Sequence, residues 1–429
     1  MASRHPMVLV ASTGHKEYLS PADACDAIAT GLRGGDASQA LADLDIAPMA
    51  DGGDGLIDAV NSALGGKVIA VPARDPLFRT RTARMGMAQW QGKTTALIES
   101  AEACGAALLP VHERQTMLAT SHGLGELILH AVRQGSRRIV IGLGGSIVTD
   151  CGLGMAQALG FVFLDAEGRE ISGIGNPGLS ALNLAQVAAV RADRLHCDFS
   201  GIEILVASDV DIPLLGPRGQ ARTFGPQKYA NAMEIEYLEQ GLANVAGVIA
   251  RSFGRDVDVP MAGAAGGIAA GLMGFLGAEV RLGAELVSSI IGLEARMLAS
   301  DVVIVGEGRL DATTLNNKAP FYTGMLAHRL GKPVVAIVGS VGSVGSVGSV
   351  ANLDNPGAAH DGGFFDELFR ADAYYAPGGT LTPERIRDGL AQAARAAGGA
   401  VRALSGTRLK VGMRARTSTR ARGHGAARR

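Results

Sequence analysis

Five short runs of apolar, mostly β-branched residues are the feature that most restricts the fold of this chain. The runs cover residues 7–10, 139–141, 202–206, 302–305 and 334–338. Segments of this length and composition are typical of strands buried on both faces of a parallel sheet. Because successive parallel strands need a long crossover, usually a helix, we expect an α/β fold.

Helical patterns fill the segments between these runs. One helix is expected to begin at Ser20-Pro21, an N-cap residue followed by proline at the first helical position. Another is expected from Pro383 to about Leu404, where apolar residues recur at spacings of three and four. The triplet Gly-Ser-Val is repeated four times over 339–350, a low-complexity segment that we expect to form a flexible loop.

Length and composition predict a globular chain with two domains. The 429 residues exceed what one core usually serves, and 47% of them are hydrophobic. No stretch of about 18 apolar residues predicts a membrane span, and residues 1–6 hold no apolar segment of a secretory signal. The four cysteines are scattered, which argues against a disulfide framework. We therefore expect a reduced, cytoplasmic protein.

The net charge of −1 conceals a basic tail. Residues 408–429 contain eight Lys or Arg and no acid, which leaves 32 basic against 41 acidic residues in the rest of the chain. An acidic body argues against a nucleic-acid-binding protein. We expect the tail to be a disordered, solvated extension, with polyanion binding as the alternative.

Polar, glycine-rich segments follow three of the predicted strands directly. They cover residues 142–150, 208–211 and 306–318. In open α/β sheets, ligands bind beyond the carboxyl ends of the strands, so these three segments predict one ligand-binding cleft. The alternative is ordinary turn and capping chemistry, which also favours Gly and Asp.

The segment Gly142-Leu143-Gly144-Gly145-Ser146 is suited to hold a phosphate group. Its glycines leave backbone N–H groups bare at the start of a probable helix. It is not a dinucleotide fingerprint, because Ile147 stands where the last glycine belongs, and this disfavours an NAD-dependent oxidoreductase. The chain has no Walker A loop either, so a nucleotide site must be of another kind.

Three further features carry candidate chemistry, each with a plainer alternative. Asp209 and Asp211 can offer two carboxylates to one Mg²⁺, or form a turn before Pro213. The loop over 50–55, Ala-Asp-Gly-Gly-Asp-Gly, leaves room for a ligand, or is an ordinary turn before a helix. Lys318 can neutralise a transferring phosphoryl group, or lie in solvent.

Six strings of the chain resemble those of the type I glycerate kinase family, in its order and at about its spacing. They are MADGGDG at 49–55, TSHGLGEL at 120–127, GLGGS at 142–146, FGPQK at 224–228, GAAGG at 263–267 and GEGRLD at 306–311. A single string is a weak signal, whereas six in order are a strong one. The resemblance covers roughly residues 7 to 400 and leaves out the triplet repeat and the basic tail.

The resemblance implies two α/β domains with a cleft between them. A Rossmann-like domain would comprise 1–75 and 285–405, and an inserted α/β domain would comprise 76–284. The implied reaction is ATP-dependent phosphorylation of D-glycerate, with 2-phosphoglycerate favoured over 3-phosphoglycerate and Mg²⁺ as the metal. The partners would be ATP and a small hydroxy acid, with no nucleic acid and no membrane. The oligomeric state stays open, a homodimer included.

The implied chemistry is in-line phosphoryl transfer, which depends mostly on positioning and charge neutralisation. The catalytic candidates are Asp51, Asp311, Lys16 and Lys318, with either aspartate as the acceptor of the hydroxyl proton. The metal candidates are Asp209 and Asp211. The substrate-binding and phosphate-binding candidates are Gly52, Gly53, Asp54, Ser121, Gly144, Gly145, Ser146, Asp150, Lys228, Gly266, Gly267 and Glu307.

The chain departs from the family pattern at several polar positions. Thr13 stands for an aspartate, Asp54 for a glutamate, Val148 for a threonine and Ile212 for an asparagine. These changes remove or shorten polar groups, so two alternatives stay open. One is a kinase for a related small hydroxy acid or polyol, and the other is a non-catalytic ligand-sensing protein on the same scaffold.

Overall fold

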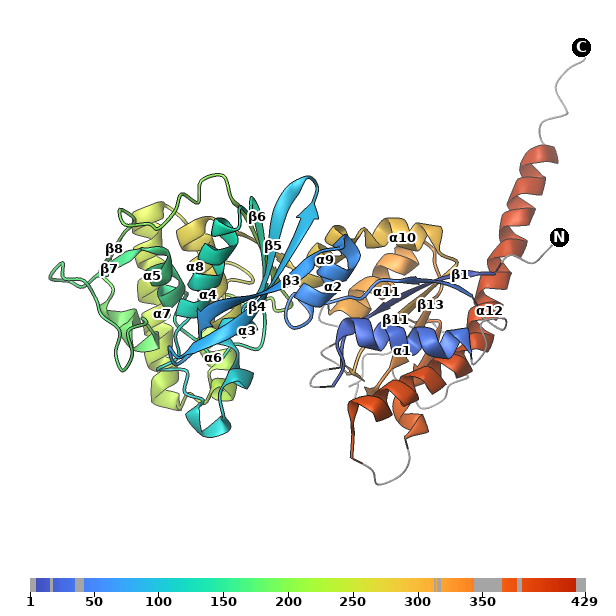
Figure 1. The fold of residues 1–429 in the computed structure, drawn as a ribbon, viewed down its shortest axis with the longest axis horizontal. Helices are drawn as coiled ribbons and strands as arrows, with labels where there is room; N and C mark the ends of the chain where they lie inside the picture. The colour runs from blue at the N-terminus through green and yellow to red at the C-terminus, as the bar shows by residue number, and fades with distance from the viewer. Residues whose placement is uncertain are drawn as a thin grey trace, which may run out of the picture. The chain divides into compact units, whose positions relative to one another are not determined.

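The computed structural model describes residues 5–15, 18–34, 42–311, 314, 318–342, 365–375 and 380–421, with the backbone alone over 406–421. The chain forms two compact units, Met1–Met49 with Gly292–Arg429 and Ala50–Ile291 (Figure 1). The first unit therefore contains both ends of the chain, and the second is one continuous insertion. This arrangement confirms the α/β fold with an inserted second unit that the sequence predicts.

The boundaries of the units differ from the expected ones. Residues 50–75 and 285–291, which we expected in the first domain, lie in the second unit. The reason is strand pairing, since β3 (Lys67–Arg74) pairs along its whole length with β4 (Thr80–Trp90) of the inserted sheet. The helices α2 (Leu56–Leu64) and α9 (Gly283–Ile291) contact each other and this same sheet.

The first unit is built on a parallel sheet of five strands in the order β15-β13-β11-β1-β2. The strands are β1 (Met7–Ser12), β2 (Asp43–Ile46), β11 (Val302–Gly306), β13 (Val334–Val338) and β15 (Glu367–Arg370). Numbered along this unit alone, the order is 2-1-3-4-5, a doubly wound arrangement. The strand order reverses between β1 and β11, which is where such sheets bind ligands.

Helices cover both faces of this sheet. On one face, Val8 and Val10 join a core with Ile28 of α1 (Pro21–Arg33) and Leu390 of α12 (Pro383–Ala421). Leu9 is equally buried but points to the opposite face, where α10 (Leu293–Ala299) and α11 (Ala319–Arg329) contact β1. The short strands β12 (Arg309–Leu310) and β14 (Ser340–Val341) pair with each other.

The predicted helix starts are confirmed, and one helix end differs. The Ser20 side chain accepts a hydrogen bond from the Asp23 amide at the start of α1, as an N-cap should. The helix α12 begins at Pro383 but runs to Ala421, into the tail for which we expected disorder. Eight of the fourteen residues of 408–421 are arginine, alanine, leucine or lysine, which are strong helix formers. Residues 343–350 of the triplet repeat and 422–429 of the tail lie outside the described residues.

The second unit contains a mixed sheet of six strands in the order β10-β9-β6-β5-β4-β3. Parallel pairing joins β5 (Lys93–Glu99), β6 (Arg138–Leu143), β9 (Glu203–Ser208) and β10 (Glu279–Leu282), while β3 and β4 are antiparallel additions. All five predicted strands are present, as β1, β6, β9, β11 and β13. The others were not predicted. Several of them are short, β3 and β10 lie at the edges of the sheet, polar residues interrupt the apolar ones of β4, and β5 has only three apolar residues in a row.

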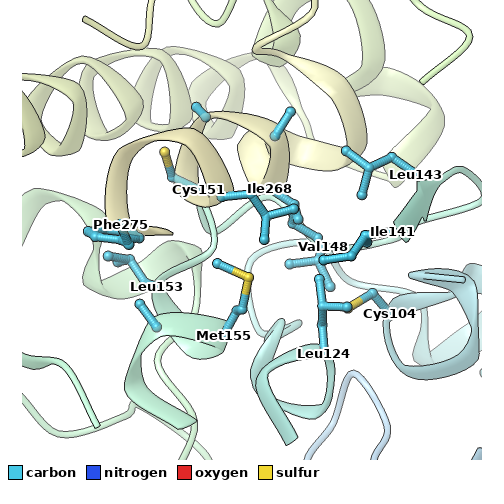
Figure 2. Close-up of a cluster of buried hydrophobic side chains, with 14 of the residues drawn as sticks. Cys104, Leu124, Ile141, Leu143, Val148, Cys151, Leu153, Met155, Ile268 and Phe275 are labelled. Atoms are coloured by element: carbon cyan, nitrogen blue, oxygen red, sulfur yellow. The ribbon is translucent and has the colours of Figure 1, made fainter. Parts of the chain in front are cut away.

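A large core lies on one face of this sheet. Figure 2 shows Leu124, Ile141, Val148 and Ile268 packed together within it. The helices around this core are α4 (His122–Arg133), α5 (Leu153–Leu159), α6 (Gln220–Phe224), α7 (Ala232–Phe253) and α8 (Ala264–Leu276). This unit also contains α3 (Ala101–Cys104), the antiparallel pair β7 (Val162–Leu164) and β8 (Ala189–Arg191), and short 3-10 helices such as Ala181–Gln186. Among the helices that the structure describes, none combines the length and apolar character needed to cross a bilayer.

Candidate functional site

The strand register of the second unit brings two of the predicted loops together. Gly142 and Leu143 of β6 pair with Ala207 and Ser208 of β9. Gly144 and Asp209 therefore leave adjacent parallel strands at the same level, where neighbouring strands lie about 4.8 Å apart. The glycine-rich loop after β6 and the acidic segment after β9 are thus side by side at the carboxyl edge of the sheet.

The acidic loop over 50–55 lies across this same edge in backbone contact. A methyl group at Gly52 would lie 2.7 Å from Ala207 Cβ, and one at Gly142 would lie 2.1 Å from the Gly52 carbonyl oxygen. A methyl group at Gly144 would lie 2.9 Å from Gly53 Cα. Gly52 also has φ of 94°, which side-chain-bearing residues rarely adopt. Glycine is therefore required where the acidic loop meets β6 and β9.

Four carboxylates are presented at this edge. Asp51 and Asp209 are half-buried, and Asp54 and Asp211 are exposed. The segments 50–55, 144–150 and 208–213 contain no Lys or Arg. A phosphate group approaching them would meet negative charge, which a bound cation would offset. Within the described ranges, no three His, Cys, Asp or Glu side chains come together as a metal-binding group.

Glu99 is a residue of this edge that sequence reasoning missed. It is the last residue of β5, it pairs with Gly142, and its side chain is buried. Its Oε1 accepts a hydrogen bond of 2.9 Å from the Ile57 amide at the start of α2. Burial raises the pKa of Glu99 to about 7, and the nearby Asp54, Asp58 and Glu102 act in the same direction. The available signal was a carboxylate directly after the apolar segment 96–98.

Asp150 and Ser121 are brought together, but inside the protein. Both side chains are fully buried, and Asp150 Oδ2 accepts from both the amide and the hydroxyl of Ser121. The amides of Gly152 and Gly154 also donate to this carboxylate, at 2.9 and 3.2 Å. Burial raises the pKa of Asp150, and these hydrogen bonds act against the rise. Ser121 and Asp150, both expected to contact a ligand, are thus buried inside the second unit. There they connect the starts of α4 and α5.

Lys228 is also buried, whereas the sequence analysis expected it to face a ligand. Its Nζ donates a 2.6 Å hydrogen bond to the Val148 carbonyl oxygen. Burial lowers the pKa of Lys228 to about 7, although Cys104 and Asp150 favour its charged form. The side chain therefore supports the segment that follows the glycine-rich loop from within.

Gly266 and Gly267 support that segment from another side. Both have positive φ, 77° and 80°, inside a kinked start of α8. A methyl group at Gly266 would lie 1.9 Å from the Val148 carbonyl oxygen, and the Gly266 carbonyl accepts from the Cys151 amide at 3.2 Å. These two glycines allow close packing of backbone on backbone, and both are buried.

Glu307, Asp311 and Lys318 lie at the carboxyl edge of the sheet in the first unit. Glu307 follows β11, is buried, and its Oε1 accepts a 2.8 Å hydrogen bond from the Thr314 hydroxyl. That hydroxyl also accepts from the Asp311 amide at 3.1 Å, so the loop is held in shape. Asp311 forms an ion pair of 3.9 Å with Arg309. Lys318 is half-buried at the residue before α11.

The loop after β1 lies beside this segment, at the point where the strand order reverses. His15 is buried, and a methyl group at Gly308 would lie 3.3 Å from His15 Cα. Burial lowers the pKa of His15 to about 4, so its imidazole is neutral at physiological pH. Sequence reasoning did not select His15 as a site residue. Lys16 lies outside the described residues.

The departures from the family pattern do not all face a ligand. Val148 is fully buried in the apolar core of the second unit (Figure 2). Ile212 is half-buried, and its carbonyl accepts from the Gly263 amide at 3.1 Å. Thr13 is half-buried, and its hydroxyl donates to the Gly306 carbonyl at 3.2 Å. Val148 is thus a packing residue, while Thr13 and Ile212 are partly accessible.

Known proteins resemble this chain over most of its length. The model of the glycerate kinase family matches residues 8–355. A glycerate 2-kinase of Escherichia coli (strain K12) is 39% identical over 335 residues, which cover 77% of this chain and 84% of the relative. A glycerate kinase of Bacillus subtilis (strain 168) is 36% identical over 333 residues, which cover 77% of this chain and 84% of that relative.

A solved structure agrees with these sequence relatives. The crystal structure of a glycerate kinase 2 from Salmonella typhimurium LT2 matches with a TM-score of 0.78 and 33% identity, covering 93% of this chain and 99% of that one. Fold, glycine-rich loop and relatives together define an enzyme of the kinase class, a phosphotransferase. The chain belongs to the glycerate kinase family.

Proposed function

We propose that this enzyme phosphorylates D-glycerate with ATP and releases 2-phosphoglycerate. The observation that carries the proposal is the convergence of the acidic loop over 50–55, the glycine-rich loop and the Asp209 segment at one sheet edge. The name of the Escherichia coli relative, a glycerate 2-kinase, favours the 2-phosphate product.

The residues present fit a nucleotide phosphate with its metal. Gly145 is exposed, and no atom beyond its chain neighbours lies closer than 3.7 Å to the place of a Cβ, so its backbone is open to a ligand. The Gly144 amide donates to Ser100 Oγ at 3.4 Å. Asp209 and Asp211 would hold Mg²⁺, which usually takes one or two carboxylates together with phosphate oxygens. When bound, ATP supplies the phosphoryl group and Mg²⁺ neutralises part of its charge.

The side chains of this chain would orient the substrate and move one proton. Gly144, Gly145 and Ser146 hold phosphate oxygens, and Ser146 Oγ is itself held by the Val148 amide at 3.0 Å. Asp51 or Asp311 accepts the proton of the substrate hydroxyl. Lys16 and Lys318 neutralise the carboxylate or the transferring phosphoryl group. Glu307 keeps the Asp311 loop in shape through Thr314.

The test is an assay that identifies substrate and product together. The enzyme, ATP, Mg²⁺ and D-glycerate are incubated with enolase, which converts 2-phosphoglycerate directly to phosphoenolpyruvate. We expect phosphoenolpyruvate to appear without added phosphoglycerate mutase. A signal that depends on the mutase would show that the product is 3-phosphoglycerate. ADP release measured over a panel of hydroxy acids and polyols would show whether another substrate is preferred by more than tenfold in kcat/KM.

A further inference from the structure

We propose that Glu99 is a positioning residue that holds the acidic loop over 50–55 against the glycine-rich loop. The proposal rests on the proposed function, because it assigns a task to a residue behind that site. Glu99 itself is buried and touches neither expected ligand, so it would act through the backbone that it orders.

The first observation is a capping contact that the local sequence does not supply. The helix α2 begins after Gly55, which has φ of 89° and offers no side chain to cap the helix. The Ile57 amide would therefore lack a partner inside its own segment. Glu99 Oε1 provides that partner from β5, at 2.9 Å and 42 residues away along the chain.

The second observation is the position of the glycine-rich loop relative to Glu99. The segment that follows Glu99 runs beside this loop and is joined to it by backbone hydrogen bonds. Ser100 donates to Gly142 at 2.8 Å, Ala106 donates to Gly145 at 2.8 Å, and Ile147 donates to Cys104 at 2.9 Å. The continuous segment 99–106 thus contacts two parts of the site. Its backbone is hydrogen-bonded to the glycine-rich loop, and its Glu99 side chain is hydrogen-bonded to the start of α2.

The charges around Glu99 make this contact sensitive to pH. Asp54 lies on the acidic loop, Asp58 on α2 and Glu102 on α3, and all three raise the pKa of Glu99. On β4, Arg84 pairs with Asp58, its amide donates to Glu102, and Arg81 lies 3.8 Å from Glu102, so these arginines are shared with other acids. Burial and the three acids favour the protonated form of the Glu99 carboxyl. In that form, the carbonyl oxygen can still accept the hydrogen bond from the Ile57 amide. Ionisation near pH 7 adds a fourth negative charge beside the acidic loop.

The test compares Glu99→Gln and Glu99→Ala with Glu126→Gln. Glutamine retains an acceptor for the Ile57 amide but cannot ionise, whereas alanine removes the acceptor. Glu126 is a matched control, because its carboxylate also accepts a backbone amide, that of Arg74 at 2.7 Å, away from the three loops. Two readouts are needed: hydrogen exchange of the Ile57 amide, which does not depend on turnover, and kcat and KM as functions of pH.

We expect Glu99→Ala to expose the Ile57 amide to at least tenfold faster exchange and to lower kcat by about 10²-fold, since small misplacements of reacting groups carry penalties of this size. Glu99→Gln should keep slow exchange and a kcat within about threefold of wild type, and should lose a pH step near 7. Glu126→Gln should change neither the Ile57 exchange nor the pH profile.

Three results would overturn the proposal. They are wild-type kcat in Glu99→Ala, equal damage from the glutamine and alanine variants, and a fall in kcat of the same size in Glu126→Gln. If the wild-type enzyme does not turn over D-glycerate, the proposed function fails. The exchange of the Ile57 amide then still decides whether Glu99 holds the acidic loop.

Discussion

Asp150 Oδ2 accepts hydrogen bonds from both the amide and the hydroxyl of Ser121, each at 2.8 Å. The Ser121 hydroxyl in turn accepts from the Met155 amide at 2.8 Å, so the pair ties α4 to α5. Ser121 belongs to one of the strings that carry the family resemblance, both residues were candidates for ligand binding, and both are fully buried. Their contribution is therefore to the position of the helices behind the site, and it should appear as stability.

Asp150→Ala should destabilise the protein by at least about 3 kcal/mol, because it leaves several buried N–H groups without an acceptor. Asp150→Asn keeps the shape and one acceptor oxygen, so about half that loss is expected. Urea unfolding checks both values. As a control, Asp54→Asn removes an exposed acid from the acidic loop and should leave the midpoint unchanged. A stable but inactive Asp150→Ala enzyme would instead indicate a ligand contact.

Asp209→Asn should lower kcat by at least about 10²-fold, the scale expected when one electrostatic stabiliser is lost. The Mg²⁺ concentration for half-maximal activity should rise, while thermal stability stays within about 1 kcal/mol of wild type. Asp198→Asn is the matched control, since this exposed aspartate precedes the same strand that Asp209 follows. Unchanged Mg²⁺ dependence in Asp209→Asn would contradict the metal assignment.

Gly52→Ala and Gly65→Ala separate a steric clash from backbone strain. Both glycines have positive φ, 94° and 61°, so each substitution costs about 1 kcal/mol in the helix-flanking backbone. Space around Gly65 is open, whereas a methyl group at Gly52 would lie 2.7 Å from Ala207 Cβ. We expect Gly52→Ala alone to lower kcat/KM by about 10²-fold, measured in the enolase-coupled assay. Equal activity of the two variants would show that the acidic loop tolerates displacement from β9.

Lys228→Met should change the pH dependence of stability. Burial lowers the pKa of Lys228 from 10.5 to about 7, so the folded protein resists protonation that the unfolded chain accepts. The contribution of the neutral amine to folding stability is therefore fully present above pH 10.5 and is lost as the pH falls through 7. Between pH 9 and pH 6 the free energy of unfolding of wild type should therefore fall, relative to Lys228→Met, by on the order of 2 kcal/mol. A constant difference would mean that the amine is charged where it lies.

Glu99→Gln should change the pH dependence in the opposite direction. The pKa of Glu99 is raised from 4.5 to about 7, so its contribution to stability is fully present below 4.5 and is lost as pH rises through 7. Between pH 5 and pH 8, wild type should lose on the order of 2 kcal/mol relative to Glu99→Gln. Urea unfolding of both proteins at several pH values measures this. A wild-type curve parallel to that of Glu99→Gln would refute it.

The local sequence by itself determined the fold class and the family. Apolar β-branched runs such as 139–141 and 302–305 favour buried strands, and Ser20 with Pro21 favours the start of a helix through contacts within the same segment. These signals are local, because they depend on propensities and on hydrogen bonds between near neighbours. The same holds for the six family strings, which were readable in order without any knowledge of packing.

Only the tertiary structure decided which polar residues reach the surface of the site. Lys228 is buried against the Val148 carbonyl, 80 residues away, and Asp150 against Ser121, 29 residues away. The Glu99 side chain accepts its hydrogen bond from the Ile57 amide, 42 residues away. Burial and the desolvation that shifts a pKa depend on what other segments pack against a side chain. No local pattern encodes these contacts, because they arise from strand order and register, which bring distant segments of the chain to one edge of the sheet.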